Sequence, residues 1–138
     1  MRKRTKAREC ALKILYSIDI TKNDADEATN SYWLNNEEKD VEVRRFAEAL
    51  VEGVTKHGNA IDKLLSKYTA NWELKRMAVI DRNVLRFATY ELLFASDVPP
   101  KVAINEAIDI VKKYGDKDSG KFVNGVLDKI NKEERKTK

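Results

Sequence analysis

The sequence predicts an all-α protein, a compact bundle of about six or seven helices. Apolar residues recur at intervals of three and four along most of the chain, the spacing of one helix face. The 138 residues include only 5 glycines and 2 prolines, too few to punctuate a protein of many strands. Hydrophobic residues make up 42%, enough for one core in a chain of single-domain size. We therefore expect one domain over residues 1–138, with a basic arm over about 1–8 and a frayed tail over about 131–138.

The first half of the chain predicts three longer helices and one short one. Residues 5–20 form the first helix, and the polar segment 21–39 forms a loop with one short helix packed by Trp33. The third helix ends at Lys56 and Gly58, a basic last turn followed by a glycine. Asn59 is expected to cap the fourth helix. The apolar faces of the first, third and fourth helices are Ala7, Cys10, Ala11, Ile14, Leu15 and Ile18; Val43, Phe46, Ala47, Leu50, Val51 and Val54; and Ile61, Leu64, Leu65 and Tyr68.

The second half predicts a connector and three helices. Residues 69–77 connect, with Trp72, Leu74 and Met77 pointing inward. Residues 79–96 are apolar on several faces, which indicates a central, buried helix. Pro99 and Pro100 begin the next helix, and Gly115 ends it. The last helix begins near Asp118 or Ser119, and its Gly125 indicates close packing against a neighbouring helix, because a mid-helix glycine costs about 1 kcal/mol relative to alanine.

The residues that catalysis or metal binding would need are sparse. The chain has one histidine and one cysteine, whereas a zinc site needs three or four ligands. We expect His57 to lie at a helix end on the surface and Cys10 to be a small core residue. The five glycines are too dispersed for a phosphate-binding loop. We therefore expect no enzyme activity, no cofactor and no metal.

The positive charge is concentrated at the amino terminus. The first eight residues carry a charge of +5, and the whole chain has a net charge of +4, so the rest of the chain sums to −1. Such a patch attracts phosphate backbones, although a solubilising tail is an equally good interpretation of the run alone. Tyr16 lies two helical turns beyond Arg8, where it is either a contact residue or a half-buried core tyrosine. The candidate RNA-binding cations of this region are Arg2, Lys3, Arg4, Lys6, Arg8 and Lys13.

Two further segments carry candidate functional residues. Arg82 and Arg86 share one helix face, where they either bind an anion or pair with acidic neighbours. Asp118 and Phe122 follow a loop near a helix start and could form an exposed partner surface. Spacing does not separate these alternatives.

Several short runs of residues, each occurring once, follow one another along nearly the whole chain. They are Ala7-Arg8-Glu9 with Ala11, Leu15 and Tyr16; Phe46 with Leu50-Val51-Glu52-Gly53-Val54; Ile80-Asp81-Arg82 with Leu85-Arg86; Tyr90-Glu91-Leu92; Asp97-Val98-Pro99; Val102-Ala103-Ile104-Asn105-Glu106-Ala107; and Lys121-Phe122-Val123-Asn124-Gly125-Val126-Leu127. In order and spacing they resemble the NusB transcription antitermination family. The resemblance implies two small helical subdomains and a non-enzymatic factor that supports ribosomal RNA transcription.

The resemblance also implies partners and site residues. The basic amino terminus, with Arg2, Lys3, Arg4, Lys6 and Arg8 at matching positions, would bind a boxA-like single-stranded RNA. Arg82 and Arg86, from their shared helix face, are further candidate RNA-binding residues. Thr5 and Lys6 stand where part of the family's arginine run would be. Lysine keeps the positive charge of arginine but lacks its planar pair of hydrogen-bond donors. The small-subunit ribosomal protein that acts as NusE would bind at the matching positions, and the complex would join RNA polymerase and other Nus factors. Those positions are Tyr16, Asp81, Asp118 and Phe122.

Three other functions compete with this interpretation. The same helical module resembles the RNA-binding part of cytosine-5 ribosomal RNA methyltransferases, which would need a further catalytic domain. A purely protein-binding adaptor would show no salt-dependent RNA affinity. A DNA-binding helix-turn-helix would need a distinct short recognition helix, which the pattern does not show.

The location and the self-association state follow from weaker signals. The chain shows no apolar leader and no span of about 20 apolar residues, so we expect a cytoplasmic protein. Some members of the family that it resembles form homodimers. The sequence leaves both a monomer and a homodimer open.

Overall fold

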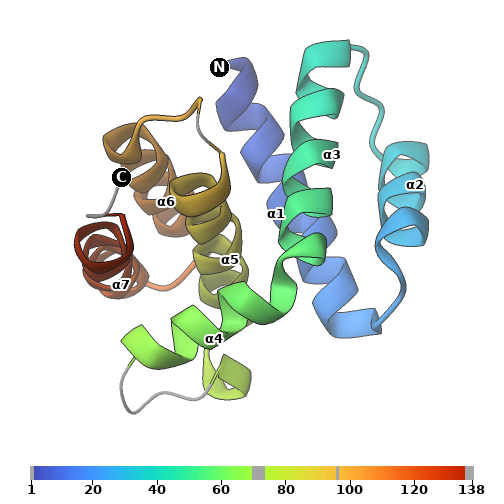
Figure 1. The fold of residues 1–138 in the computed structure, drawn as a ribbon. Helices are drawn as coiled ribbons and strands as arrows, with labels where there is room; N and C mark the ends of the chain where they lie inside the picture. Colours follow the sequence, from blue (N-terminus) through green and yellow to red (C-terminus); the bar gives the residue numbers. More distant parts are fainter. Residues whose placement is uncertain (1, 70–73, 96, 136–138) are drawn as a thin grey trace. The chain divides into compact units, whose positions relative to one another are not determined.

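The computed structural model describes residues 2–69, 74–95 and 97–135, and every regular element in these ranges is a helix. The all-α prediction is therefore confirmed. The chain divides into two compact units, Met1–Lys56 and His57–Lys138 (Figure 1). Each unit has its own set of packed helices.

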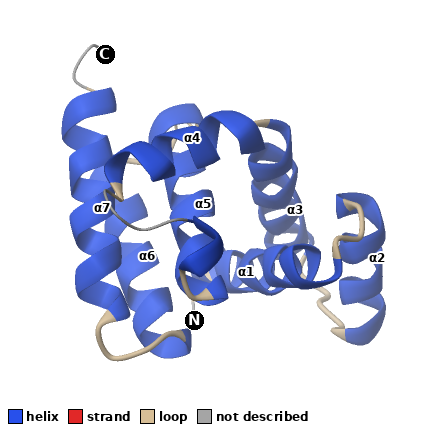
Figure 2. Ribbon diagram, turned by 90° about the horizontal axis from the view of Figure 1, so that it is seen from below, coloured by secondary structure: helices blue, strands red, loops and turns tan. Residues whose placement is uncertain are grey.

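The first unit consists of three helices, α1 (Lys3–Thr21), α2 (Ala25–Asn35) and α3 (Val41–Lys56). The long helices α1 and α3 pack side by side, and α2 contacts both (Figures 1 and 2). The predicted apolar faces of α1 and α3 form this core. The hydrophobic residues exposed by 2% or less are Ala7, Ala11, Leu12 and Ile14 from α1 and Val43, Ala47, Leu50 and Val51 from α3.

Local signals set the ends of α1 and α2. Lys22 follows α1 with φ 64° and ψ 17°, in the left-handed region, and its N–H donates to the carbonyl of Ile18. The Asp24 side chain caps α2 by accepting from the N–H of Glu27 at 2.8 Å. Because α1 begins at Lys3, most of the expected basic arm over residues 1–8 is helical. The cations therefore have fixed directions around α1.

The second unit contains α4 (Gly58–Tyr68), the short 3-10 helix η1 (Leu74–Arg76), α5 (Val79–Phe94), α6 (Pro100–Tyr114) and α7 (Ser119–Glu134). Helices α5, α6 and α7 pack against one another, and α4 packs on α5 and α7 (Figure 2). Helix α5 is the central helix of this unit, as predicted. Its fully buried side chains include Val84, Leu85, Phe87 and Ala88.

Several predicted helix ends differ from the observed ones. Helix α3 ends at Lys56, a basic residue in its last turn, as predicted. Gly58 begins α4 and lacks positive φ, and His57 takes the N-cap position, so the role of Gly58 as a terminating glycine and the Asn59 cap were both wrong. Pro100 and Gly115 do mark the two ends of α6. Helix α7 continues to Glu134, so 131–134 do not fray; residues 136–138 and the predicted inward-pointing Trp72 lie outside the described residues.

The predicted close packing at Gly125 was wrong. Gly125 is exposed in the middle of α7, and a Cβ atom built on it would meet no heavy atom within 4 Å. No structural feature of the described residues near this position requires a glycine.

We expect Gly125→Ala to raise the free energy of unfolding by up to about 1 kcal/mol, because alanine loses less backbone entropy in a helix than glycine does. Urea denaturation followed by circular dichroism measures this change. A loss of stability would contradict the observed space around Gly125.

Candidate RNA and partner interfaces

Exposed cations follow one side of α1. Arg2, Lys3, Arg4, Lys6 and Lys13 are all exposed. Lys3, Lys6 and Lys13 are spaced by three and seven residues, which places them on one helix face, and Tyr16 continues that face with 41% exposure. Arg2 directly precedes the helix. We call Arg2, Lys3, Lys6 and Lys13 the basic stripe. A stripe of cations that leads to an exposed tyrosine can hold phosphates and stack a base.

Two arginines of the same helix turn toward α3 instead. The guanidinium carbons of Arg4 and Arg8 lie 4.7 Å and 5.2 Å from the ring centroid of Phe46. Arg8 is only 2% exposed and is the largest fully buried side chain of the described residues. The structure therefore gives Arg8 an internal, stabilising contact. Arg4, which is exposed, keeps access to a ligand.

The basic stripe is paired with an acidic segment of the same unit. The ammonium group of Lys6 contacts a carboxylate oxygen of Glu38 at 2.6 Å. Lys3 lies 3.3 Å from a carboxylate oxygen of Asp40 and 3.4 Å from one of Glu42. The residues of this acidic segment, Glu38, Asp40 and Glu42, were not among the predicted site residues. Their only sequence signal was the high acid content of the stretch between α2 and α3.

These pairs change the proton affinities of both partners. A hydrogen bond and the charge of Asp40 raise the pKa of Lys3, and the same two effects from Glu38 raise the pKa of Lys6. The hydrogen bond from Lys6 lowers the pKa of Glu38. Burial raises the pKa of Asp40, but the Glu42 backbone N–H and Lys3 outweigh it and leave that pKa below its ordinary value. All four groups are therefore held in their charged forms.

A small hollow of about 230 Å³ lies beside the stripe, between α1 and α2. Lys6 and Lys13 line it from α1, and Tyr32 and Trp33 line it from α2. The two aromatic rings meet edge to face, with centroids 5.0 Å apart. The prediction that Trp33 packs a short helix agrees with its half-buried position. Aromatic and cationic groups so close together are typical of surfaces that bind single-stranded nucleic acid.

Arg82 and Arg86 have partners inside the second unit. Arg82 is 8% exposed, and its guanidinium donates to the carbonyls of Leu74, at 2.7 Å, and Met77. Arg86 makes two bonds to the Asp62 carboxylate of α4, at 2.9 Å and 3.1 Å. Asp62 is the acidic neighbour that the structural alternative required for Arg86, and backbone carbonyls take that place for Arg82. An RNA contact by either arginine stays a prediction, and it would have to compete with these bonds.

Three of the four predicted partner residues line one cavity. Asp81 from α5 and Asp118 and Phe122 from the start of α7 face a hollow of about 320 Å³. Its remaining walls are formed by Arg76, Met77, Ala78, Asp116 and Ser119. Tyr16, the fourth predicted residue, belongs to α1 of the first unit. An apolar ring beside carboxylates fits a partner segment that carries both apolar and hydrogen-bond-donating groups.

Asp81 is the unusual group of this cavity. It is 9% exposed, and its Oδ1 atom is buried without a hydrogen-bond partner among the described residues. Burial raises the pKa of Asp81; the Ser119 hydroxyl opposes this shift, and the charge of Asp116 adds to it. A buried carboxylate oxygen without a donor is costly, so a donor from a binding partner would be stabilising here.

We expect the stability difference between Asp81→Asn and the native chain to depend on pH. A carboxyl whose pKa is higher in the native than in the unfolded state binds protons more readily when folded. Stability therefore falls as the pH rises above the group's ordinary pKa of 3.8 and the carboxyl ionises. The asparagine variant lacks this loss. Its free energy of unfolding should therefore rise relative to the native chain as pH increases from below 3.8 to neutrality, measured by urea denaturation. A difference that does not vary with pH would contradict the burial effect, and Asp118→Asn, at an exposed position, is the control.

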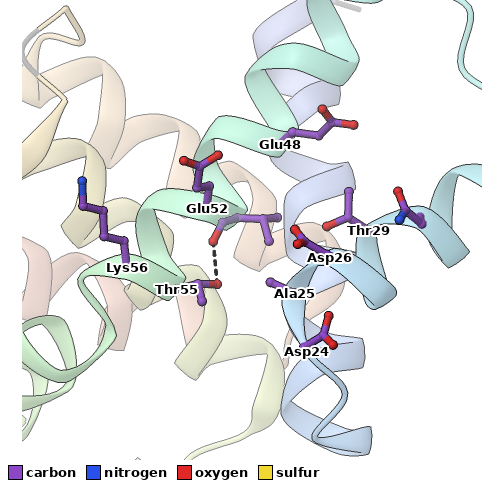
Figure 3. A pocket seen from close by; sticks show the side chains of 10 residues that line it. Asp24, Ala25, Asp26, Thr29, Glu48, Glu52, Thr55 and Lys56 are labelled. Carbon is purple, nitrogen blue, oxygen red and sulfur yellow. Dashed lines mark hydrogen bonds between the residues drawn. The ribbon is translucent and has the colours of Figure 1, made fainter.

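A larger acidic hollow of about 780 Å³ lies between α2 and α3 (Figure 3). Asp24 and Asp26 border it from the start of α2, and Glu48 and Glu52 border it from α3. The Thr55 hydroxyl donates to the carbonyl of Val51 at 2.8 Å and so stays within its own helix. Sequence spacing does not reveal this group of carboxylates, because they fall at ordinary surface positions of two separate helices.

Other candidate chemistry is absent from the described parts of the chain. Residues 2–69, 74–95 and 97–135 hold no group of three or more histidine, cysteine or acidic side chains placed to bind a metal. None of the described helices is both long and apolar enough to span a bilayer. Cys10 is buried, as predicted. His57 is half-buried and stacks on Phe94 with centroids 4.1 Å apart, so it is less exposed than expected.

The fold and these sites define an all-helical protein with a basic helix face in one unit and an acidic, partly apolar cavity in the other. Residues 5–132 match the NusB family, and the chain belongs to that family. It is 52% identical over 128 residues to the transcription antitermination protein NusB of Anaeromyxobacter dehalogenans (strain 2CP-1 / ATCC BAA-258), covering 93% of this chain and 89% of that protein.

Solved structures agree in fold. NusB of T. maritima is 40% identical, with a TM-score of 0.87, over 96% of this chain and 92% of that one. A chain from the crystal structure of antitermination factors NusB and NusE in complex with dsRNA is 32% identical, with a TM-score of 0.88, over 96% of this chain and 98% of that one. The resemblance inferred from the short sequence runs is therefore confirmed.

Proposed function

We propose that this protein is a non-enzymatic antitermination factor that binds a boxA-like single-stranded RNA together with the NusE ribosomal protein. The complex would act in the cytoplasm on the RNA polymerase elongation complex, with other Nus factors, during ribosomal RNA transcription. The observation that carries the RNA proposal is the exposed basic stripe of α1, which ends at Tyr16. A similar chain, 32% identical, occurs in a crystal structure with NusE and dsRNA, which supports both partners.

The RNA contact is assigned to the cations that are exposed on α1. Arg2, Lys3, Arg4, Lys6 and Lys13 can reach a phosphate without any change in the core. Lysines act here as point charges, whereas Arg2 and Arg4 can also make planar contacts to phosphate. Arg8, Arg82 and Arg86 are buried or bonded internally, so we assign them to the support of the surfaces instead.

The partner contact is assigned to the cavity around Asp81. Phe122 offers an apolar contact, and Asp81 and Asp118 offer acceptors for a basic or N–H-bearing side chain. Tyr16, exposed on α1, is the remaining proposed partner residue. Two weak RNA contacts, one from each protein, would combine into a tighter one once the proteins are joined.

Fluorescence anisotropy of a labelled boxA-like RNA tests the proposal. The protein is titrated with and without the ribosomal partner, at two salt concentrations, against a scrambled strand and a duplex of the same length. We expect salt-weakened binding that favours the boxA-like strand and tightens with the partner. Failure to bind any of these RNAs with the partner present would leave a protein-binding adaptor in place of the RNA-binding factor.

The same titration with Phe122→Ala tests the cavity. We expect this variant to bind the ribosomal partner about tenfold or more weakly, because truncation of an aromatic side chain in an interface pocket costs the most affinity. RNA binding in the absence of the partner should be unchanged. Unchanged partner affinity would remove this cavity from the interface. The remaining predicted partner is a second copy of this chain, and sedimentation measures whether it self-associates.

A further inference from the structure

We propose that Glu38, Asp40 and Glu42 are specificity-determining residues for RNA, because they act as an internal substitute for phosphate on the basic stripe. This inference rests on the proposed RNA-binding function. It concerns acidic residues, whereas the RNA-binding positions that the family resemblance implies are all basic. Its basis is the set of ion pairs that joins these acids to Lys3 and Lys6.

The pairs occupy the donors that an RNA backbone would use. Lys6 reaches Glu38 at 2.6 Å, and Lys3 reaches both Asp40 and Glu42. Each lysine ammonium has three donors, and the carboxylates use one donor of Lys6 and two of Lys3, so a phosphate has fewer donors and a largely neutralised charge to bind. The side chains of Lys3 and Lys6 nevertheless remain 57% and 51% exposed, so an incoming phosphate can approach them from solvent.

The acidic segment is held in place and does not need to fold on to the stripe. One Glu38 carboxylate oxygen accepts from the backbone N–H of Asp40 at 3.0 Å. Asp40 in turn accepts from the backbone N–H of Glu42 at 2.9 Å, just where α3 begins. These bonds fix the direction of both carboxylates. A fixed competitor loses little entropy when it pairs, which makes it effective against a mobile RNA chain.

The consequence is selective. Any RNA that binds Lys3 and Lys6 must either share these ammonium groups with the carboxylates or displace them, and in both cases the acids repel its backbone. An RNA that adds base contacts, or that is held by a second protein, gains binding free energy that offsets this repulsion. An RNA that offers only phosphates does not. The acidic segment should therefore lower affinity for arbitrary RNA more than affinity for the preferred RNA.

The test compares two triple variants with the same change in charge. The first, Glu38→Gln/Asp40→Asn/Glu42→Gln, removes the acidic segment's charges and keeps its hydrogen-bond acceptors. The second, Asp26→Asn/Glu48→Gln/Glu52→Gln, removes three charges from the hollow of Figure 3, away from the ion pairs of the basic stripe. Both lie in the first unit, so both alter its general electrostatic field.

Anisotropy with the boxA-like strand and its scrambled counterpart gives the result. We expect the first variant to bind the scrambled strand about tenfold more tightly and the boxA-like strand about threefold more tightly, since exposed ion pairs of this kind are individually weak. Discrimination between the strands should fall accordingly. The control variant should change both affinities less than about twofold at roughly 0.1 M salt, because screening acts over about 10 Å.

Each other outcome overturns a defined statement. Equal gains in the two variants, or equal gains for the two strands, would overturn the selective role of the segment. An unchanged first variant alongside native protein that binds RNA would overturn the inference and leave the proposed function intact. Native protein that binds no RNA even with its partner would overturn the proposed function itself. If the triple variant loses its cooperative thermal transition, Asp40→Asn/Glu42→Gln, which keeps the mostly buried Glu38, takes its place under the same criteria.

Discussion

Neutralising the basic stripe, by Arg2→Gln/Lys3→Gln/Lys6→Gln/Lys13→Gln, is expected to weaken RNA binding about 100-fold at low salt. All four side chains are exposed, so solvent-borne phosphates can approach them. Removal of each phosphate contact should also reduce the slope of log affinity against log salt by roughly 0.7 for a single strand. Anisotropy at several salt concentrations measures both quantities, and circular dichroism should show an intact helical fold.

A matched variant separates this effect from net charge alone. Lys22, Lys63, Lys101 and Lys129 are exposed lysines that do not belong to the basic stripe, and the last three are in the second unit. Their replacement by glutamine removes the same total charge, and we expect less than about a threefold loss of affinity. If both variants weakened RNA binding equally, that binding would be a diffuse property of the charged chain, and α1 would have no special role.

Truncating Arg8 is expected to act on stability, by about 3 kcal/mol, and hardly on RNA binding. Arg8→Ala removes a side chain that is 2% exposed and lies over the Phe46 ring. A desolvated cation–π contact contributes about 2 kcal/mol or more, and removal of a fully buried side chain adds the cost of the cavity that it leaves. Urea denaturation gives the free energy of unfolding, and anisotropy below the unfolding transition gives the RNA affinity.

The control for this prediction lies on the same helix. Lys13→Ala, at an exposed position, should change stability by less than about 0.5 kcal/mol but should weaken RNA binding. Arg8→Ala should therefore lower stability and spare RNA affinity, whereas Lys13→Ala should do the opposite. A stable Arg8→Ala protein with strongly reduced RNA affinity would show that Arg8 leaves its buried position to meet RNA.

The helices were predictable because their signals are local. Apolar spacing along α1, α3 and α7 comes from the period of the helix itself, so it marks the core faces wherever the helices pack. The end of α6 at Gly115 and its start at Pro100 were predictable for the same reason. The predictions for Gly125 and Asn59 were wrong because a glycine or an asparagine has several roles, and only neighbouring helices decide between them.

The candidate sites divide along a similar line. By itself, the sequence determined the all-helical class, the family, and the concentration of charge at the amino terminus, because these depend on residue order and composition. Only the tertiary structure decided which cations are available. The angular positions of the residues around α1 expose Lys6 and Lys13 and direct Arg8 inward to Phe46. The segment before α3 places carboxylates beside Lys3 and Lys6. The side chains that meet at these contacts are far apart in the sequence, so their pairing depends on how the helices pack, which no local pattern records.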